Sequence, residues 1–125
     1  MKSSRLVSVI ALQPMLNAFS VLIASRPNLS LLASAVNMDE LQLIQGENKP
    51  DVILVYLVRD GCLAGGMTAY ETIARIKNKW PQVRCVAILK YVMQLEKARE
   101  SGADQVLLDG VSAERLLAAI EGNLM

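Results

Sequence analysis

The sequence predicts an α/β fold, a doubly wound sandwich in which a five-stranded parallel sheet is covered by helices on both faces. Short apolar segments alternate along the chain with segments whose apolar residues recur at helical spacing. Strands buried on both faces read as continuous apolar runs, whereas covering helices bury one stripe. The 125 residues fit a single domain, 1–125, and 53% hydrophobic with 20% charged residues excludes a disordered chain.

The first strand and helix are predicted in residues 5–24. The run 5–12, RLVSVIAL, is apolar and rich in β-branched residues, and the Gln-Pro pair at 13–14 ends it. Pro14 suits the first turn of a helix, because the N–H that proline lacks has no partner there. The apolar residues of this helix are Met15, Leu16, Phe19, Leu22 and Ile23.

The same segment permits a second interpretation, as a secretory signal or a membrane span. Residues 6–24 carry no charge, and residues 33–35, Ala-Ser-Ala, resemble a cleavage site. The Gln-Pro pair at 13–14 interrupts the apolar run, however, and Arg26 separates it from residues 33–35. We therefore favour a strand followed by a buried helix, in a cytoplasmic protein without a membrane partner.

The second unit joins a strand at 29–35, LSLLASA, to a helix. Asn37 is able to cap this helix, which runs through Leu41 and Ile44 and ends near Gly46. The pattern predicts a second β–α unit that follows the first without a linker.

The third unit begins with residues 51–57, the most continuous apolar run of the chain. A loop with three glycines follows at 58–66, VRDGCLAGG, and then a helix at 67–79. The buried face of this helix is predicted to carry Tyr70, Ile73 and Ile76.

The last two units complete the alternation. Strands are predicted at 84–89 and 104–108, with a short helix at 92–100 between them. Ser112 is placed to cap the final helix. The apolar stripe of that helix is Leu116, Leu117, Ile120 and Leu124.

Composition excludes several kinds of site. The net charge of +1 argues against bulk electrostatic binding to nucleic acid or membrane, and the absence of histidine removes imidazole bases and His-based zinc sites. Cys62 and Cys85 are read as unpaired thiols in a reducing compartment. We read the following cations as a solvated helix end rather than as a nucleic-acid patch: Arg75, Lys77, Lys79, Arg84 and Lys90.

Four segments give the chain a resemblance to the receiver domain of response regulators, especially that of LuxR-type transcription regulators. They are RPNLSLLASAVNMDELQLI, KPDVILVYL, ETIARIKNKWPQVRCVAIL and ESGADQVLLDGVSAERLLAAI, and they cover most of the chain. The resemblance implies a flavodoxin-like fold with strand order 2-1-3-4-5 and a place in bacterial two-component signalling.

The resemblance also locates a phosphorylation site, and this sequence departs from it everywhere. An active receiver carries an acidic pair after strand one, an acceptor aspartate after strand three, a hydroxyl after strand four and a lysine after strand five. The matching positions here are Ala11, Leu12, Tyr56, Leu89 and Asp109. Because carboxylates hold the Mg²⁺ of such a site, we expect no metal, no other cofactor and no phosphotransfer.

Three further expectations concern the same strand ends. Tyr56 is expected to fill the vacated site, although a small apolar ligand pocket is the alternative. Lys90 and Asp109 are expected to form a salt bridge at the rim. Asp60 is the acid that a shifted alignment would recruit as phosphoacceptor.

These observations predict a phosphorylation-independent pseudo-receiver that is not an enzyme and acts by contact with a protein partner or by dimerisation. Any DNA binding would reside on a longer parent chain or on a partner. Receivers commonly use their last two helices and fifth strand for contact, and the candidate contact residues are Tyr91, Met93, Leu95, Val106, Arg115 and Ala119. Val106 replaces the family's switch-reporting aromatic, which favours one fixed conformation. The alternatives are a phosphorelay receiver with a non-standard acceptor and a small-ligand sensor.

Overall fold

The computed structural model describes residues 5–56, 69–90 and 92–122. Its strands are β1 (Arg5–Ile10), β2 (Leu29–Ala35), β3 (Val52–Tyr56), β4 (Arg84–Leu89) and β5 (Gln105–Leu108). Its α-helices are α1 (Met15–Ala24), α2 (Met38–Gln45), α3 (Ala69–Lys79), α4 (Leu95–Ser101) and α5 (Ala113–Glu121). A short 3₁₀ helix, η1 (Val92–Gln94), leads into α4.

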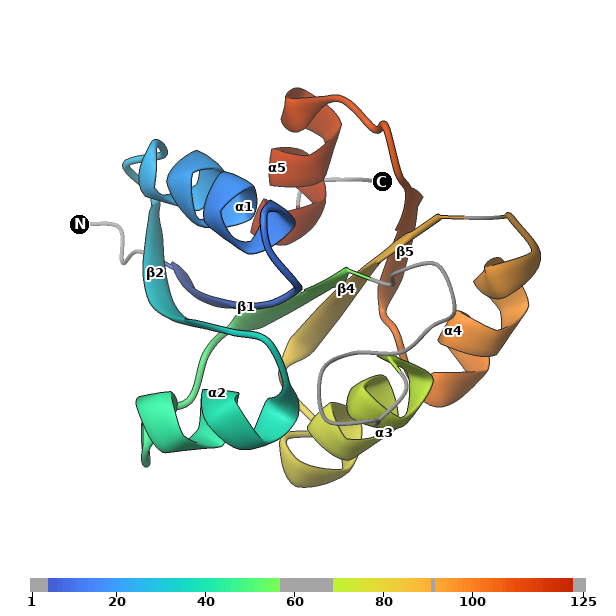
Figure 1. Ribbon diagram of the computed structural model, residues 1–125, viewed down its shortest axis with the longest axis horizontal. Helices are drawn as coiled ribbons and strands as arrows, with labels where there is room; N and C mark the ends of the chain where they lie inside the picture. The colour runs from blue at the N-terminus through green and yellow to red at the C-terminus, as the bar shows by residue number, and fades with distance from the viewer. Residues whose placement is uncertain (1–4, 57–68, 91, 123–125) are drawn as a thin grey trace.

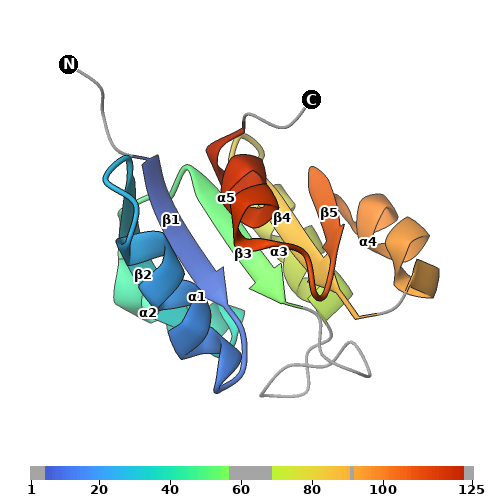
Figure 2. The same cartoon turned by 90° about the horizontal axis from the view of Figure 1, so that it is seen from above.

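The five strands form one parallel sheet in the order β2-β1-β3-β4-β5. Helices α1 and α5 cover one face, and α2, α3 and α4 cover the other (Figure 1). The arrows of β1 and β3 point the same way in Figure 2, so their carboxyl ends lie at one edge of the sandwich. The predicted flavodoxin-like fold and its strand order are confirmed.

The sheet divides the core into two apolar layers. Val52, Leu54 and Tyr56 of β3 face α1 and α5, where they pack with Phe19 and Ile120. The intervening residues of the same strand, Ile53 and Val55, face α2, α3 and α4. Successive side chains of a strand point to opposite faces, which explains why β3 is an unbroken apolar run.

The N-terminal segment is a strand followed by a buried helix, as expected. Strand β1 ends at Ile10, two residues before the predicted end, but the N–H of Ala11 still donates to the carbonyl of Ala35 at 3.1 Å. Leu16, Phe19 and Ile23 of α1 are buried. In the part of the chain that the structure describes, none of the helices has the length and apolarity to cross a membrane.

Helix caps follow the prediction. The Asn37 side chain accepts a hydrogen bond from the N–H of Glu40 at 2.8 Å, and Ser112 accepts one from the N–H of Arg115 at 3.2 Å. Each satisfies a backbone donor that the first turn leaves without an intrahelical partner. Gly102 ends α4 at φ 118°, and a Cβ there would lie 2.8 Å from Cγ of Lys77.

Helices α2 and α4 show details that the sequence pattern did not specify. Ile44 is 52% exposed, because Met38, Leu41 and Gln45 form the buried face of α2. The helix predicted at 92–100 begins as the 3₁₀ turn η1, and α4 extends to Ser101. The loop at 58–66, the first residues of the helix predicted from 67, and Leu124 lie outside the described residues.

Gln45 makes a polar contact inside the second apolar layer. The Ser8 hydroxyl of β1 donates to Oε1 of Gln45, and both side chains are buried. Nε2 of Gln45 has no hydrogen-bond partner. A buried donor without a partner costs free energy, so this contact specifies how α2 sits on β1 rather than adding stability.

We predict that the pair behaves non-additively. Gln45→Leu leaves the Ser8 hydroxyl buried without its acceptor, and Ser8→Ala leaves the Gln45 amide alone. Each variant should lose about 1–3 kcal/mol of unfolding free energy. The double variant removes both polar groups and should recover most of that loss. Urea unfolding of the four proteins measures this; a double variant that loses the sum of the two single losses would contradict it.

Candidate functional site

The structure brings to one edge of the sheet the five positions that the resemblance matches to a phosphorylation site. Strand register does this, because Ile10 pairs with Val55, Tyr56 with Ile88, and Leu89 with Leu108. The positions that follow or end these strands are Ala11, Leu12, Tyr56, Leu89 and Asp109. The five positions therefore share one edge of the sheet, as the expected strand order implies.

Apolar side chains close this edge. Ala11 and Leu89 are completely buried, and Tyr56 is 7% exposed. The Tyr56 ring packs against Phe19 of α1, with centroids 5.6 Å apart and an interplanar angle of 55°. This is the tilted geometry that aromatic pairs favour. Packed Ala11 and Tyr56 therefore stand where the resemblance places carboxylates, and packed Leu89 stands where it places a hydroxyl.

A hydrogen bond joins the ends of β3 and β5 across β4. The Tyr56 hydroxyl donates to Oδ2 of Asp109 at 3.1 Å, and the N–H of Asp109 donates to the carbonyl of Leu89 at 2.6 Å. Burial, the negative charge of Asp109 and this hydrogen bond all raise the pKa of Tyr56 above its ordinary value of 10.0. Tyr56 is thus a neutral donor at physiological pH, and Asp109 is its acceptor.

The predicted salt bridge between Lys90 and Asp109 is wrong. No ion pair joins these two described residues, and the Asp109 carboxylate accepts from Tyr56 instead. The N–H of Lys90 donates to Oε1 of Gln94 at 2.9 Å, at the start of the turn into η1. The Lys90 side chain is exposed, where an ion pair would add little stability.

The residues at the strand ends do not fit a magnesium ion. Of the five positions, Asp109 alone offers a carboxylate, whereas Mg²⁺ takes oxygen ligands in octahedral geometry. Nowhere in residues 5–56, 69–90 and 92–122 do three acidic, histidine or cysteine side chains gather as metal ligands. Asp60 and Cys62 lie outside the described residues. Burial raises the pKa of the Cys85 thiol to about 12, so this thiol is not a nucleophile.

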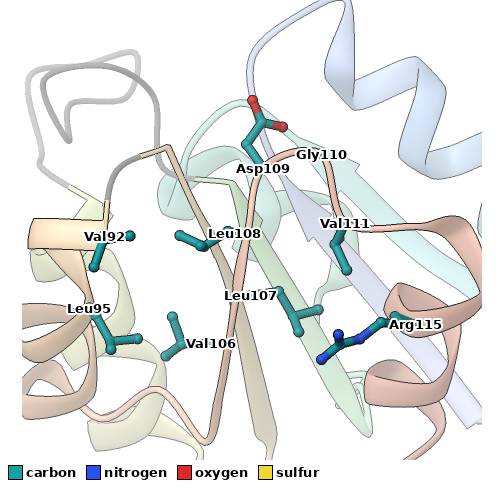
Figure 3. A pocket seen from close by; sticks show the side chains of 9 residues that line it. All are labelled: Val92, Leu95, Val106, Leu107, Leu108, Asp109, Gly110, Val111 and Arg115. Carbon is teal, nitrogen blue, oxygen red and sulfur yellow. The ribbon is translucent and has the colours of Figure 1, made fainter.

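A concavity of about 480 Å³ lies along β5, between α4 and α5 (Figure 3). We call it the β5 groove, and it is lined by Val92, Leu95, Val106, Leu107, Leu108, Asp109, Gly110, Val111 and Arg115. Asp109 belongs to both the groove and the closed strand ends. The other four positions at the strand ends do not line it, so the groove is distinct from the apolar ligand pocket considered there.

The predicted contact residues fall into three groups. Leu95, Val106 and Arg115 line the β5 groove, and Met93 is 86% exposed on η1. Ala119 is wrong as a contact residue, because it is completely buried between α5 and the sheet. Tyr91 lies outside the described residues.

The basic stretch serves contacts within the fold. Arg75 pairs with Asp39 of α2 at 3.5 Å. Nζ of Lys77 lies 2.8 Å from Oδ2 of Asp104 and also donates to the carbonyl of Val83. Nε of Arg84 donates to the carbonyl of Ala119 at 3.0 Å. These contacts support the interpretation as a helix end rather than a nucleic-acid patch.

Sequence reasoning named Tyr56 and Asp109 but missed their hydrogen bond. The signal was present, since β3 and β5 flank β4 and a tyrosine is long enough to reach across one strand. It also missed Val92, Leu107, Leu108 and Val111 as groove residues. Their apolar character beside the Asp-Gly pair at 109–110 was the available signal.

We predict that Tyr56→Phe lowers the unfolding free energy by about 1 kcal/mol at neutral pH, because it removes one hydrogen bond and keeps the ring. The raised pKa means that the folded state favours the neutral phenol. The stability of the native chain should therefore fall as pH rises above about 10, through the raised pKa. The variant should fall less steeply over that range. Urea unfolding at several alkaline pH values measures how the unfolding free energy of each protein changes with pH. An equal change in the two proteins would refute Tyr56 as the group whose ionisation destabilises the native chain.

The comparisons with known proteins agree with this fold. No family model matches the chain, and no curated protein matches it. Among solved structures, it is similar to a LuxR-family two-component response regulator from Aurantimonas sp. SI85-9A1, at 22% identity and a TM-score of 0.80, covering 96% of this chain and 84% of that one.

Two further structures show the same likeness. A LuxR-family DNA-binding response regulator from Staphylococcus aureus is 24% identical with a TM-score of 0.77, over 95% of this chain and 98% of that one. A CheY-like response regulator receiver domain protein from Methanospirillum hungatei JF-1 is 15% identical with a TM-score of 0.77, over 97% and 93%. At these identities the likeness establishes the fold: the chain has the architecture of response-regulator receiver domains.

Proposed function

We propose that this chain is a receiver-type domain of bacterial two-component signalling that does not accept phosphate and acts by protein–protein contact. The observation that carries the proposal is the closed edge of the sheet, where the Tyr56 ring packs on Phe19 and its hydroxyl binds Asp109. We place the domain in the cytoplasm, without enzymatic activity of its own and without direct contact to nucleic acid or membrane.

Phosphotransfer fails on electrostatic grounds. An incoming phosphoryl group needs a metal and a cation to neutralise the charge that spreads over its oxygens. At the five positions it would meet apolar side chains and the negative charge of Asp109. Placing an uncompensated charge in such surroundings costs several kcal/mol or more.

A fixed conformation follows from the same contacts. Buried packing between Tyr56 and Phe19, with the bond to Asp109, joins α1, β3 and β5 at the edge where a switch would operate. Val106 stands at the strand-five position where the family resemblance implies an aromatic reporter. A domain with one dominant conformation signals by being present and bound rather than by switching.

Exposed apolar residues mark the contact face. Val92 is 67% exposed and Leu108 45%, and both line the β5 groove; Met93, next to Val92 in η1, is 86% exposed. Apolar residues that gather on one surface indicate a binding site more strongly than single exposed ones do. We therefore propose α4, β5 and α5 as the contact face, with any DNA-binding output on a longer parent chain or on the partner.

Treatment with a small phosphodonor and Mg²⁺ is expected to leave the chain unmodified. Intact-mass spectrometry should show no added phosphate, and Mg²⁺ alone should not change the thermal midpoint, because the strand ends offer no ligand set. Asp60→Asn is the matched control for a shifted acceptor. A hydroxylamine-sensitive phosphate that appears on the native chain and not on this variant would overturn the proposal.

Capture of a partner should depend on the β5 groove. The purified chain, used as bait in lysate of its own organism, is expected to retain a protein that Val106→Glu loses, since a buried unpaired charge in the interface is costly. Val21→Glu is the matched control, because Val21 is 70% exposed on α1 and lies outside the groove. Circular dichroism checks that both variants fold. Retention by Val106→Glu with loss by Val21→Glu would place the contact face elsewhere.

A further inference from the structure

The β5 groove holds one cation, Arg115 of α5. The backbone N–H of Arg115 binds the Ser112 side chain. Among the described residues, no acid pairs with the Arg115 guanidinium and no carbonyl accepts a hydrogen bond from it. Figure 3 shows this side chain extending from α5 toward β5. A planar guanidinium with its N–H donors is therefore available to a molecule in the groove.

The one acid that lines the groove does not neutralise this cation. The Asp109 carboxylate accepts the hydrogen bond from the Tyr56 hydroxyl at 3.1 Å. In Figure 3 this carboxylate lies at the end of β5 and points away from the other side chains of the groove. Glu114, the acid next to Arg115 in the sequence, is exposed and does not line the groove. A bound molecule would therefore meet a positive charge.

The other walls of the groove are apolar. Apart from Asp109 and Arg115, six aliphatic side chains and Gly110 line it. The aliphatic side chains offer no hydrogen-bond donor or acceptor, so a sugar, nucleotide or polyol would leave polar groups without partners against them, which costs free energy. An apolar molecular body gains free energy there by leaving water.

The size and shape of the groove suit a small molecule. Cavities that hold small ligands measure about 300–1,000 Å³, and this one measures about 480 Å³. Val92 and Leu95 form one wall, and Val111 and Arg115 form the other, with β5 between them (Figure 3). A ligand that lies along β5 is able to touch both walls, with one end at the guanidinium.

We propose that the β5 groove binds a small amphipathic monocarboxylate, with its carboxylate on Arg115 and its apolar body along β5. A carboxylate accepts two parallel N–H donors from a guanidinium, which fixes its orientation. One negative charge matches the one available cation, whereas a phosphate dianion would bring an uncompensated charge against apolar walls. An amine of the same size would meet the like charge of Arg115 instead.

This inference goes beyond the proposed function. The groove belongs to the proposed contact face, so a bound carboxylate and a protein partner would exclude each other there. The concentration of such a carboxylate would then control the contact without any phosphate. The ligand pocket considered from the sequence lay at the strand ends instead, where Ala11, Tyr56 and Leu89 are buried.

Titration of the purified chain with octanoate, followed by amide NMR spectra, tests the site. Octanoate below its micelle-forming concentration is expected to shift the amide signals of Val106, Leu107, Leu108 and Val111 and to reach saturation. Acetate has the same head without the apolar body, and octylamine has the same body with the opposite charge. Both should bind at least about tenfold more weakly than octanoate.

Arg115→Gln should weaken octanoate binding by about fivefold or more, because it removes the charge and the paired donors. Arg99→Gln is the matched control and should bind like the native chain, since Arg99 is exposed in α4 and does not line the groove. Circular dichroism checks that both variants fold. If Arg115→Gln does not fold, the comparison of octanoate with octylamine on the native chain decides.

Several outcomes would overturn the site. They are octanoate shifts that do not saturate, octylamine that binds as tightly as octanoate, and Arg115→Gln that binds like the native chain. Shifts of the same amides when the protein concentration alone rises would identify a second copy as the occupant and would also overturn it. A chain that binds no octanoate but captures a protein lost in Val106→Glu would leave the proposed contact face standing. Octanoate binding without any captured protein would support the site and count against that face.

Discussion

The hydrogen bond from Tyr56 to Asp109 is the constraint on which the arrangement of the carboxyl ends of the strands depends. It crosses β4 to hold the ends of β3 and β5, and the same ring packs against α1. In an active receiver this edge is open and charged, since metal and phosphate must enter there. Here the Tyr56 ring fills the space, and Asp109, the one carboxylate among the five positions, accepts the Tyr56 hydrogen bond, so these five positions do not offer the oxygen ligand set of a magnesium ion.

Closing one edge changes which part of the surface is able to act. Ala11, Tyr56 and Leu89 are buried at the strand ends, and the Cys85 thiol is buried in the core. The cations Arg75, Lys77 and Arg84 contact neighbouring elements. Among the described residues, the β5 groove with exposed Val92 and Leu108 is the surface that we propose for contact. Covering exposed apolar area is favourable, which is why we propose association at this surface.

The fold was predictable because its signals are local and repeated. Each buried strand is an apolar run, and Asn37 and Ser112 cap their helices as the sequence indicates. What the sequence left open or predicted wrongly depends on how one element packs on another. Ile44 and Gln45 are equally possible core residues on spacing alone, and the packing of α2 on β1 selects Gln45. The charge of Lys90 made it the expected partner of Asp109. In the structure the partner is Tyr56, whose side chain is long enough to place its hydroxyl beside the Asp109 carboxylate. Ala119 was placed on the surface, although α5 turns it inward.

Asp109 joins the two parts of the molecule. Its carboxylate accepts the Tyr56 bond, its N–H continues the β4 ladder, and its side chain lines the β5 groove. Because one residue takes part in all three, the position of the groove wall depends on the bond that closes the strand ends. The two properties that we propose, the lack of phosphotransfer and the contact face beside β5, therefore both depend on Asp109, which stands where the family resemblance places a lysine and accepts the hydrogen bond from Tyr56.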